Sequence, residues 1–302
     1  MNYPDPNDIL LNIRAKQLSK RVATMTPLHR RCVLRKYYPR EGPFLYKYRA
    51  LNSDDVESVS RVKDILVESK LWLSSASAFN DPFDMSIRMT FDGSPLEKRN
   101  RMARLVKRQE PLLGFKKRNE LVTKLMINES ITSAELLQHA QDVGSRRFGV
   151  YCFAGDPRSI LMWSHYSLGH TGICIQFERS LDVDLAFGAM PVEYSDDFPS
   201  VNWVLDAATD NAKGLLRKYS GWSYEKECRL IRHEAANTTI HIDPNAVTAV
   251  ILGCCISRSA RTIIHDIVSE REVRGLPKCE IWEAKKKSGR YALQIARANS
   301  VG

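Results

Sequence analysis

The chain has 302 residues, of which 43% are hydrophobic and 26% charged, and its formal net charge is +10. Five Trp, eleven Tyr and ten Phe supply ample apolar area, which is typical of a globular protein and excludes a chain that is disordered throughout. Residues 1–50 hold eleven Lys and Arg against three acidic residues, and residues 98–124 hold ten against two. This concentration of positive charge favours a polyanionic partner, although a solvated basic face would have the same composition.

The predicted elements follow one another without an internal repeat or a clear linker. Residues 1–43 are expected to form a basic helical segment. Helices are predicted at 54–69, at two or three places within 95–144, at 157–166 after a capping Asp156, at 201–218, and at 257–270 after a capping Ser257. Strands are predicted at 44–48, 71–74, 148–154, 172–177, 190–194, 227–232, 238–242, 247–252, 278–284 and 291–297.

These elements predict an α+β fold. We expect residues 44–302 to form a single domain, with residues 95–144 as a basic helical insertion. The strands lack regular helical crossovers, which favours a mixed or antiparallel central sheet. Neither GxGxxG nor GxxxxGK[ST] occurs in the chain, so a doubly wound nucleotide-binding fold is disfavoured.

The cysteines and the apolar stretches bear on the compartment. The first residues lack a basic stretch followed by an apolar core, and the longest apolar stretch, 247–256, is too short to span a bilayer. The seven cysteines include no CxxC pair, and His165 and His170 lack companions at ligand spacing. We therefore expect a cytoplasmic protein with no metal site and no membrane partner.

The sharpest motif lies at residues 222–231. If this segment is a strand, its period of two places Glu225, Glu227 and Arg229 on one face. Two neighbouring carboxylates raise the pKa of one of them or require a nearby cation. Such a pair can hold a sugar hydroxyl and stabilise a developing positive charge. The alternative is an exposed strand face on which Arg229 pairs with a glutamate.

Three further motifs are candidates for ligand binding. In residues 45–49, Tyr46 and Tyr48 alternate with cations, a pattern that suits stacking on a ring and holding a phosphate; the alternative is an edge strand. The loop residues Ser74, Ser75 and Asn80 can fix the backbone and leave amides for a ligand, or can simply cap the loop.

Residues 159–172 carry the third of these motifs. His165 and Tyr166 are polar-tipped rings just before a strand bounded by glycine, and they are candidates to line a pocket. The alternative assigns Tyr166 to a helix core and His165 to a cap.

Together these blocks resemble a large, mainly prokaryotic family of uncharacterised domains. The motifs of that family are LYKYR, here at 45–49, an LW-S strand with FNDPF at 71–84, CF…SILMWSHY…H-GIC at 152–177, and W-YEKE-R-L at 222–231. The likeness covers about residues 44–255.

A second resemblance is to the mono-ADP-ribosyltransferase fold. It implies that Arg49 binds the phosphates of NAD, that Ser74 or Ser75 shapes the nicotinamide site, that Glu227 holds the ribose and stabilises its positive charge, and that Glu225 orients the acceptor. The function implied is NAD-dependent mono-ADP-ribosylation of nucleic acid, most simply RNA, by a toxin or antiphage effector. The chain departs from that pattern in lacking the usual Thr of the serine block.

The basic segments are candidate surfaces for binding nucleic acid or a protein partner. Candidate RNA contacts are Lys107, Arg108, Lys116, Lys117 and Arg118. The N-terminal basic helices are a candidate surface for a protein partner or an antitoxin. Two alternatives to the transferase stay open: a nucleic-acid-binding module without catalysis, and a nuclease.

Overall fold

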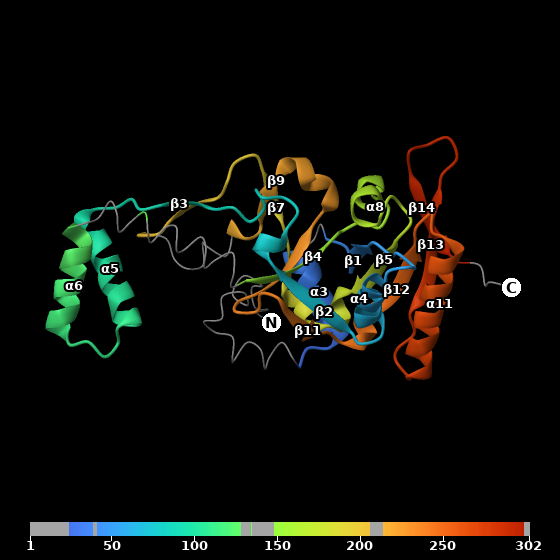
Figure 1. The fold of residues 1–302 in the computed structure, drawn as a ribbon, viewed down its shortest axis with the longest axis horizontal. Coiled ribbons are helices and arrows are strands. Elements are labelled where there is room, and N and C mark those ends of the chain that lie inside the picture. Colours follow the sequence, from blue (N-terminus) through green and yellow to red (C-terminus); the bar gives the residue numbers. More distant parts are fainter. Residues whose placement is uncertain (1–23, 39–40, 128–133, 135–147, 206–213, 299–302) are drawn as a thin grey trace. The chain divides into compact units, whose positions relative to one another are not determined.

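A computed structural model describes residues 24–38, 41–127, 134, 148–205 and 214–298. The chain divides into two compact units, each built from more than one segment. Unit 1 comprises Met1–Ser74, Gly149–Val192 and Ser220–Gly302, and unit 2 comprises Ser75–Phe148 and Glu193–Tyr219. Both helices and strands occur in each (Figure 1), so the predicted α+β class is confirmed.

Unit 1 contains two five-stranded sheets rather than one central sheet. Their strand orders are β1-β5-β12-β13-β14 and β11-β2-β4-β10-β6. The strands are β1 (Phe44–Arg49), β2 (Lys70–Ser75), β4 (Gly149–Phe153), β5 (Ile173–Glu178), β6 (Ala189–Pro191), β10 (Cys228–Arg232), β11 (Thr238–His241), β12 (Val247–Leu252), β13 (Glu280–Lys286) and β14 (Leu293–Arg297). The first sheet is mixed, because β12 and β13 are parallel while its other pairs are antiparallel.

Strand β1 joins the two sheets. It pairs along its length with β5, and Tyr46 also forms a bridge with Ala154, just beyond β4. The two backbone hydrogen bonds of this bridge are 2.9 and 2.7 Å long. Side chains at alternate positions of β1 therefore face different surroundings: Leu45 packs into the main core, whereas Tyr46 and Tyr48 pack with Trp163 in a second cluster.

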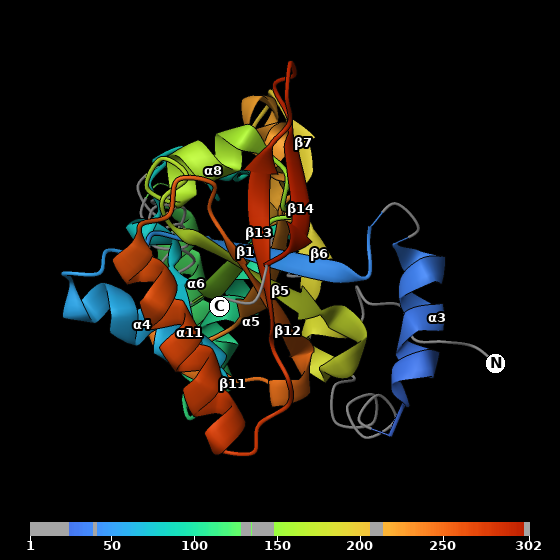
Figure 2. The ribbon, with the colours of Figure 1, turned by 90° about the vertical axis from the view of Figure 1, so that its right-hand side faces the viewer.

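Within the described residues of unit 1, the α-helices are α3 (Pro27–Tyr37), α4 (Val56–Leu66), α8 (Ile160–Tyr166), α9 (Val183–Phe187) and α11 (Arg258–Val273). Figure 2 shows α4 and α11 close together, and Lys63 of α4 forms a 2.8 Å ion pair with Glu270 of α11. Both helices bury an apolar stripe in the main core. Ser257 accepts a hydrogen bond from the backbone N–H of Ala260, so the predicted cap is confirmed.

The described part of unit 2 contains the helices α5 (Pro95–Gln109) and α6 (Phe115–Ile127) and the short strands β3 (Arg88–Thr90), β7 (Glu193–Ser195), β8 (Ser200–Asn202) and β9 (Arg217–Tyr219). A capping box of Ser94 and Glu97 starts α5. The two helices pack through Met102, Val106 and Val122. The strands pair in parallel, β3 with β8 and β7 with β9.

The structure corrects several predicted elements. The helix predicted at 201–218 is wrong at both ends, where β8 and β9 stand; the side chain of Asn202 accepts a hydrogen bond from Val204 N and turns the chain. Residues 206–213 lie outside the described part, as do residues 1–23 of the N-terminal segment and most of 128–147. Residues 190–194 form two strands, β6 and β7, instead of one.

Helix α8 begins later than predicted. Its N-cap is Ser159, because the carboxylate of Asp156 hydrogen-bonds the side chain and backbone of Arg158 instead. Among the described residues, no helix is long and apolar enough to cross a bilayer.

Candidate functional site

The segment with the two glutamates is not a continuous strand. Residues Ser220–Glu225 form a short 3₁₀ helix, and β10 begins at Cys228. Between them Lys226 adopts a left-handed backbone conformation with φ of 47°, which breaks the alternation expected of a strand. The prediction that Glu225 and Glu227 share one face of a strand is therefore wrong. Both side chains are nevertheless buried, each residue being 3% exposed.

Glu227 forms a buried ion pair with Arg229. The Nε of Arg229 lies 2.7 Å from Oε1 and its Nη2 lies 3.1 Å from Oε2, and the side chains are 0% and 3% exposed. Such a two-point contact fixes both groups. The pairing of Arg229 with a glutamate, one of the two alternatives from the sequence, is present, but in the interior and not on an exposed face.

Glu225 meets helix α8 and a group of aromatic rings. The hydroxyl of Tyr166 donates a 2.7 Å hydrogen bond to Oε1 of Glu225. The ring of His165 lies 6.5 Å from that of Trp222 and 6.2 Å from that of Tyr224. We call these four rings, from His165, Tyr166, Trp222 and Tyr224, the aromatic cluster. The predicted candidates His165 and Tyr166 are thus brought to Glu225.

Lys47 on β1 completes the charged surroundings of the two glutamates. Its ammonium donates to the carbonyl of Cys152 at 2.8 Å and lies 4.5 Å from the centre of the Tyr151 ring. Burial and then the neighbouring Arg49 lower the pKa of Lys47 to about 8, while Glu227 and Glu225 oppose this shift. We call Lys47, Arg49, Glu225, Glu227 and Arg229 the charged cluster.

Two polar atoms beside this cluster are buried and make no hydrogen bond of good geometry among the described residues. They are the Nε of Arg49 and the hydroxyl of Tyr151, a residue that is only 2% exposed. Burial raises the pKa of Tyr151 to about 12, and the charge of Arg49 opposes this rise. An unsatisfied buried group costs about 1–3 kcal/mol, so such groups concentrate where a ligand or a functional role compensates for them.

The other candidates on β1 lie away from Arg49. Tyr48 is 4% exposed, its hydroxyl donates to the carbonyl of Asp156 at 2.6 Å, and its ring meets Trp163 edge-on at 5.1 Å. It is a core residue. Tyr46, on the same side of the strand, lines a pocket. The structure therefore does not bring Tyr46 and Tyr48 together with Arg49.

The loop candidates and the basic candidates are distributed over both units. Ser74 is the last residue of unit 1 in its segment, whereas Ser75 and Asn80 belong to unit 2. The hydroxyl of Ser75 lies 2.8 Å from that of Ser77. The basic candidates Lys107, Arg108, Lys116, Lys117 and Arg118 stand at the end of α5 and the start of α6 in unit 2.

Sequence reasoning did not single out Tyr151, and it gave no separate role to Lys47, Trp222 or Tyr224, which lie within the motifs at 45–49 and 222–231. The signal for Lys47 was present, since it stands two residues before Arg49 on a strand and so shares its side. Among the described residues, no three His, Cys, Asp or Glu side chains gather in a way that could hold a metal ion.

The lowered pKa of Lys47 predicts a dependence of stability on pH. Between about pH 8 and its ordinary pKa of 10.5, Lys47 is protonated in the unfolded chain but largely neutral in the folded protein. The unfolded state then binds more protons, so this group makes the free energy of unfolding rise with pH, by about 3 kcal/mol over the range. Urea unfolding at pH 7, 8.5 and 10 should show the wild type gaining this much relative to Lys47→Met. The exposed Lys285→Met variant is the control; an equal response of both variants would contradict the assignment.

Comparison with known proteins finds one family whose model resembles part of this site. Residues 162–230 match the model of a family described as "Protein of unknown function (DUF2971)". No curated protein and no solved structure matches the chain. The matched segment begins in α8 and ends in β10, so it carries the aromatic cluster, both glutamates and Arg229. The resemblance to an uncharacterised family is thus supported over the segment that holds most of the candidate site.

Proposed function

We propose that unit 1 is an NAD-dependent mono-ADP-ribosyltransferase. The observation that carries the proposal is the charged cluster, in which two buried carboxylates lie beside three cations and next to a group of partly exposed rings. A dinucleotide presents matching chemistry: a pyrophosphate for Lys47 and Arg49, and a flat nicotinamide ring for the aromatic cluster.

The reaction breaks the bond between nicotinamide and C1′ of its ribose. Nicotinamide leaves with the bonding electrons, C1′ develops positive charge, and a nucleophilic atom of the acceptor forms the new bond and loses a proton. A carboxylate that is already fixed in a site of low dielectric constant stabilises such a charge without reorganisation. Glu225 has this position, held by the hydroxyl of Tyr166.

The roles of the two glutamates differ from those implied by the fold resemblance. Arg229 engages both oxygens of Glu227. We therefore assign the stabilisation of the ribose charge to Glu225, and to Glu227 the positioning of Arg229 beside it. Lys47, whose pKa is lowered to about 8, also contributes to the electrostatic field at the two glutamates.

The proposal is tested by incubating the full chain with NAD labelled on its adenylate, with and without RNA. Release of nicotinamide together with transfer of the label to RNA or to the chain itself is the expected result. A folded chain that neither releases nicotinamide nor transfers label, at any RNA concentration tested, would overturn the proposal.

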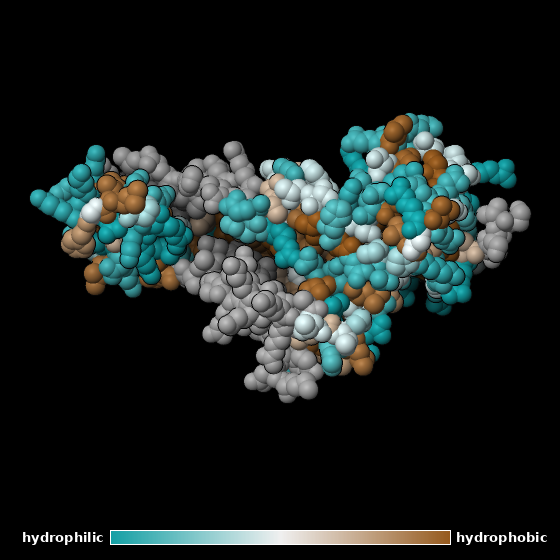
Figure 3. All heavy atoms as spheres, turned by 90° about the horizontal axis from the view of Figure 1, so that it is seen from below, coloured by the Kyte–Doolittle hydropathy of each residue, from teal (hydrophilic) through white to brown (hydrophobic). Residues whose placement is uncertain are grey.

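The helices of unit 2 suggest RNA as the acceptor, and they also support the second candidate, a nucleic-acid-binding module without catalysis. Hydrophilic residues cover much of α5 and α6 in Figure 3. Arg101, Arg104 and Arg108 follow one face of α5, and burial, followed by the charges of Arg104 and Arg108, lowers the pKa of Arg101. Concentrated cations of this kind bind phosphates and release counterions.

We therefore expect RNA binding that weakens steeply with salt. Replacing Lys116, Lys117 and Arg118 together by Ala should reduce the slope of log K against log salt concentration by about 2, since each lost phosphate contact on a single strand contributes about 0.7. The control removes the same charge from exposed sites of unit 1 by changing Arg61, Lys63 and Arg274 to Ala. Fluorescence anisotropy with a labelled RNA measures both; equal slopes for the two triple variants would exclude α6 as the RNA contact.

A further inference from the structure

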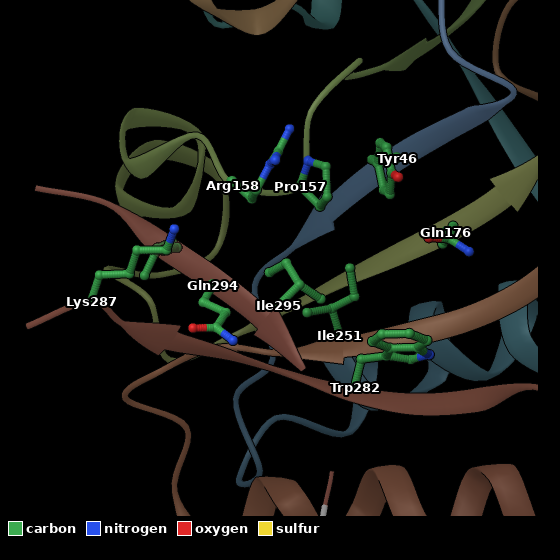
Figure 4. A pocket seen from close by; sticks show the side chains of 10 residues that line it. Tyr46, Pro157, Arg158, Gln176, Ile251, Trp282, Lys287, Gln294 and Ile295 are labelled. Atoms are coloured by element: carbon green, nitrogen blue, oxygen red, sulfur yellow. The ribbon is translucent and has the colours of Figure 1, made fainter. Parts of the chain in front are cut away.

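A pocket of about 360 Å³ lies on the face of β1 that carries Tyr46, opposite to the side chains of Lys47 and Arg49. Its base is one face of the first sheet, to which all five strands contribute: Tyr46 from β1, Gln176 from β5, Ile251 from β12, Trp282 from β13, and Leu293 and Ile295 from β14. The loop before α8 and the β13–β14 hairpin form its sides (Figure 4). This volume is within the range of small-molecule sites.

The base of the pocket is apolar and contains two rings. Ile251 is 1% exposed, Leu293 5% and Tyr46 9%. Trp282 is held in place because its Nε1 donates to Glu280 at 3.1 Å. Burial raises the pKa of Tyr46 to about 12, so its phenol stays a neutral hydrogen-bond donor. A flat, largely apolar group fits such a base.

Amide groups supply the hydrogen-bonding edge of the pocket. The Nε2 of Gln176 donates to Thr248 at 3.0 Å, which fixes the orientation of that side chain. Gln294 is exposed and points into the pocket from β14 (Figure 4). A side-chain amide offers both a donor and an acceptor, the pattern that matches the edge of a nucleobase.

The charged residues of the pocket are both cations. Arg158 and Lys287 line it, and no lining residue is acidic. Arg158 is oriented by Asp156, whose Oδ1 lies 3.0 Å from its Nε. The pocket therefore combines an apolar base that contains two rings with amide groups and positive charge at its edge. This combination favours a ligand that is flat at one end and anionic at the other.

We infer that this pocket binds a nucleoside monophosphate, with the base over the sheet and the phosphate between Arg158 and Lys287. The inference is independent of the proposed transferase activity, since it uses none of the residues of the charged cluster. It adds a second nucleotide site to unit 1.

The test is calorimetric titration of the full chain with AMP, adenosine and inorganic phosphate. AMP should bind at least tenfold more tightly than adenosine or phosphate. Gln294→Glu, which is isosteric and adds a negative charge at the pocket, should weaken AMP binding at least tenfold without weakening adenosine binding to the same extent. Lys287→Glu should act in the same direction.

Two controls locate the site. Arg290→Glu makes the same charge change as Lys287→Glu at an exposed residue of the same hairpin that does not line the pocket, and should leave AMP binding within twofold of the wild type. Glu225→Gln should leave it unchanged, which separates this site from the proposed transferase centre. The inference is overturned if AMP does not bind, if phosphate alone binds as tightly as AMP, or if Arg290→Glu weakens AMP as much as Lys287→Glu.

Discussion

Glu225→Gln is expected to lower the rate of NAD-dependent label transfer by about 10²–10³-fold, the loss typical of removing one preorganised electrostatic contact to a transition state. The amide is nearly isosteric with the carboxylate, and its oxygen can still accept the hydrogen bond from Tyr166. The variant therefore removes the negative charge and keeps the shape. Initial rates of nicotinamide release at saturating NAD measure the effect on kcat, and urea unfolding checks that the free energy of unfolding is preserved.

Tyr166→Phe provides the matched comparison. It removes the hydroxyl that positions Glu225 but leaves the carboxylate in place, so its rate should fall by a smaller factor than that of Glu225→Gln. If a folded Glu225→Gln protein transferred label at the wild-type rate, the assignment of the ribose charge to Glu225 would be refuted, whatever the result for Tyr166→Phe.

Arg229→Met should lower the free energy of unfolding by about 3–5 kcal/mol, because it leaves the carboxylate of Glu227 buried without its counter-charge. The side chains of this pair are 0% and 3% exposed, so water does not compensate for the lost partner. The midpoint and slope of urea unfolding measure the loss. The solvent-accessible pair of Arg274 and Glu270 offers a contrast, since Arg274→Met should lower the free energy of unfolding far less than Arg229→Met does.

The double variant Glu227→Gln/Arg229→Met separates the structural role of Glu227 from a catalytic one. With both charges removed, much of the lost stability should return, giving an interaction energy of about 1–3 kcal/mol in the double-mutant cycle. Additive losses would show that the two residues do not stabilise each other. Label transfer by a folded double variant would place Glu227 outside the chemistry.

The elements of unit 1 could largely be predicted, because their signals are local. The Ser257 cap and the apolar stretch that forms β12 depend on neighbouring residues in the chain, and both appear where expected. The region around Glu225 could not be predicted in the same way. A left-handed conformation at a non-glycine residue such as Lys226 is favoured by the surrounding packing, so the neighbouring residues in the sequence do not predict it.

The candidate site was predictable in part. The motif that contains Glu225, Glu227 and Arg229 was identified from the sequence. Their roles depend on their burial, which the sequence does not predict because charged side chains are usually exposed. The alternation along residues 45–49 already implied that Tyr46 and Tyr48 face away from Arg49. The burial of the Tyr151 hydroxyl beside Arg49 had no signal in the sequence, since it arises from the approach of β1 to the end of β4.

The position of β1, paired with β5 and bridged at Tyr46 to Ala154 just beyond β4, has a consequence for mutational scanning. Along β1, the side chains of Tyr46 and Tyr48 face the side on which the pocket lies, whereas those of Lys47 and Arg49 face the opposite side. Substitutions along this strand should therefore produce two classes of phenotype that alternate residue by residue. Inserting a single residue after Phe44 would exchange the two classes, so this strand should tolerate changes of side chain far better than changes of length.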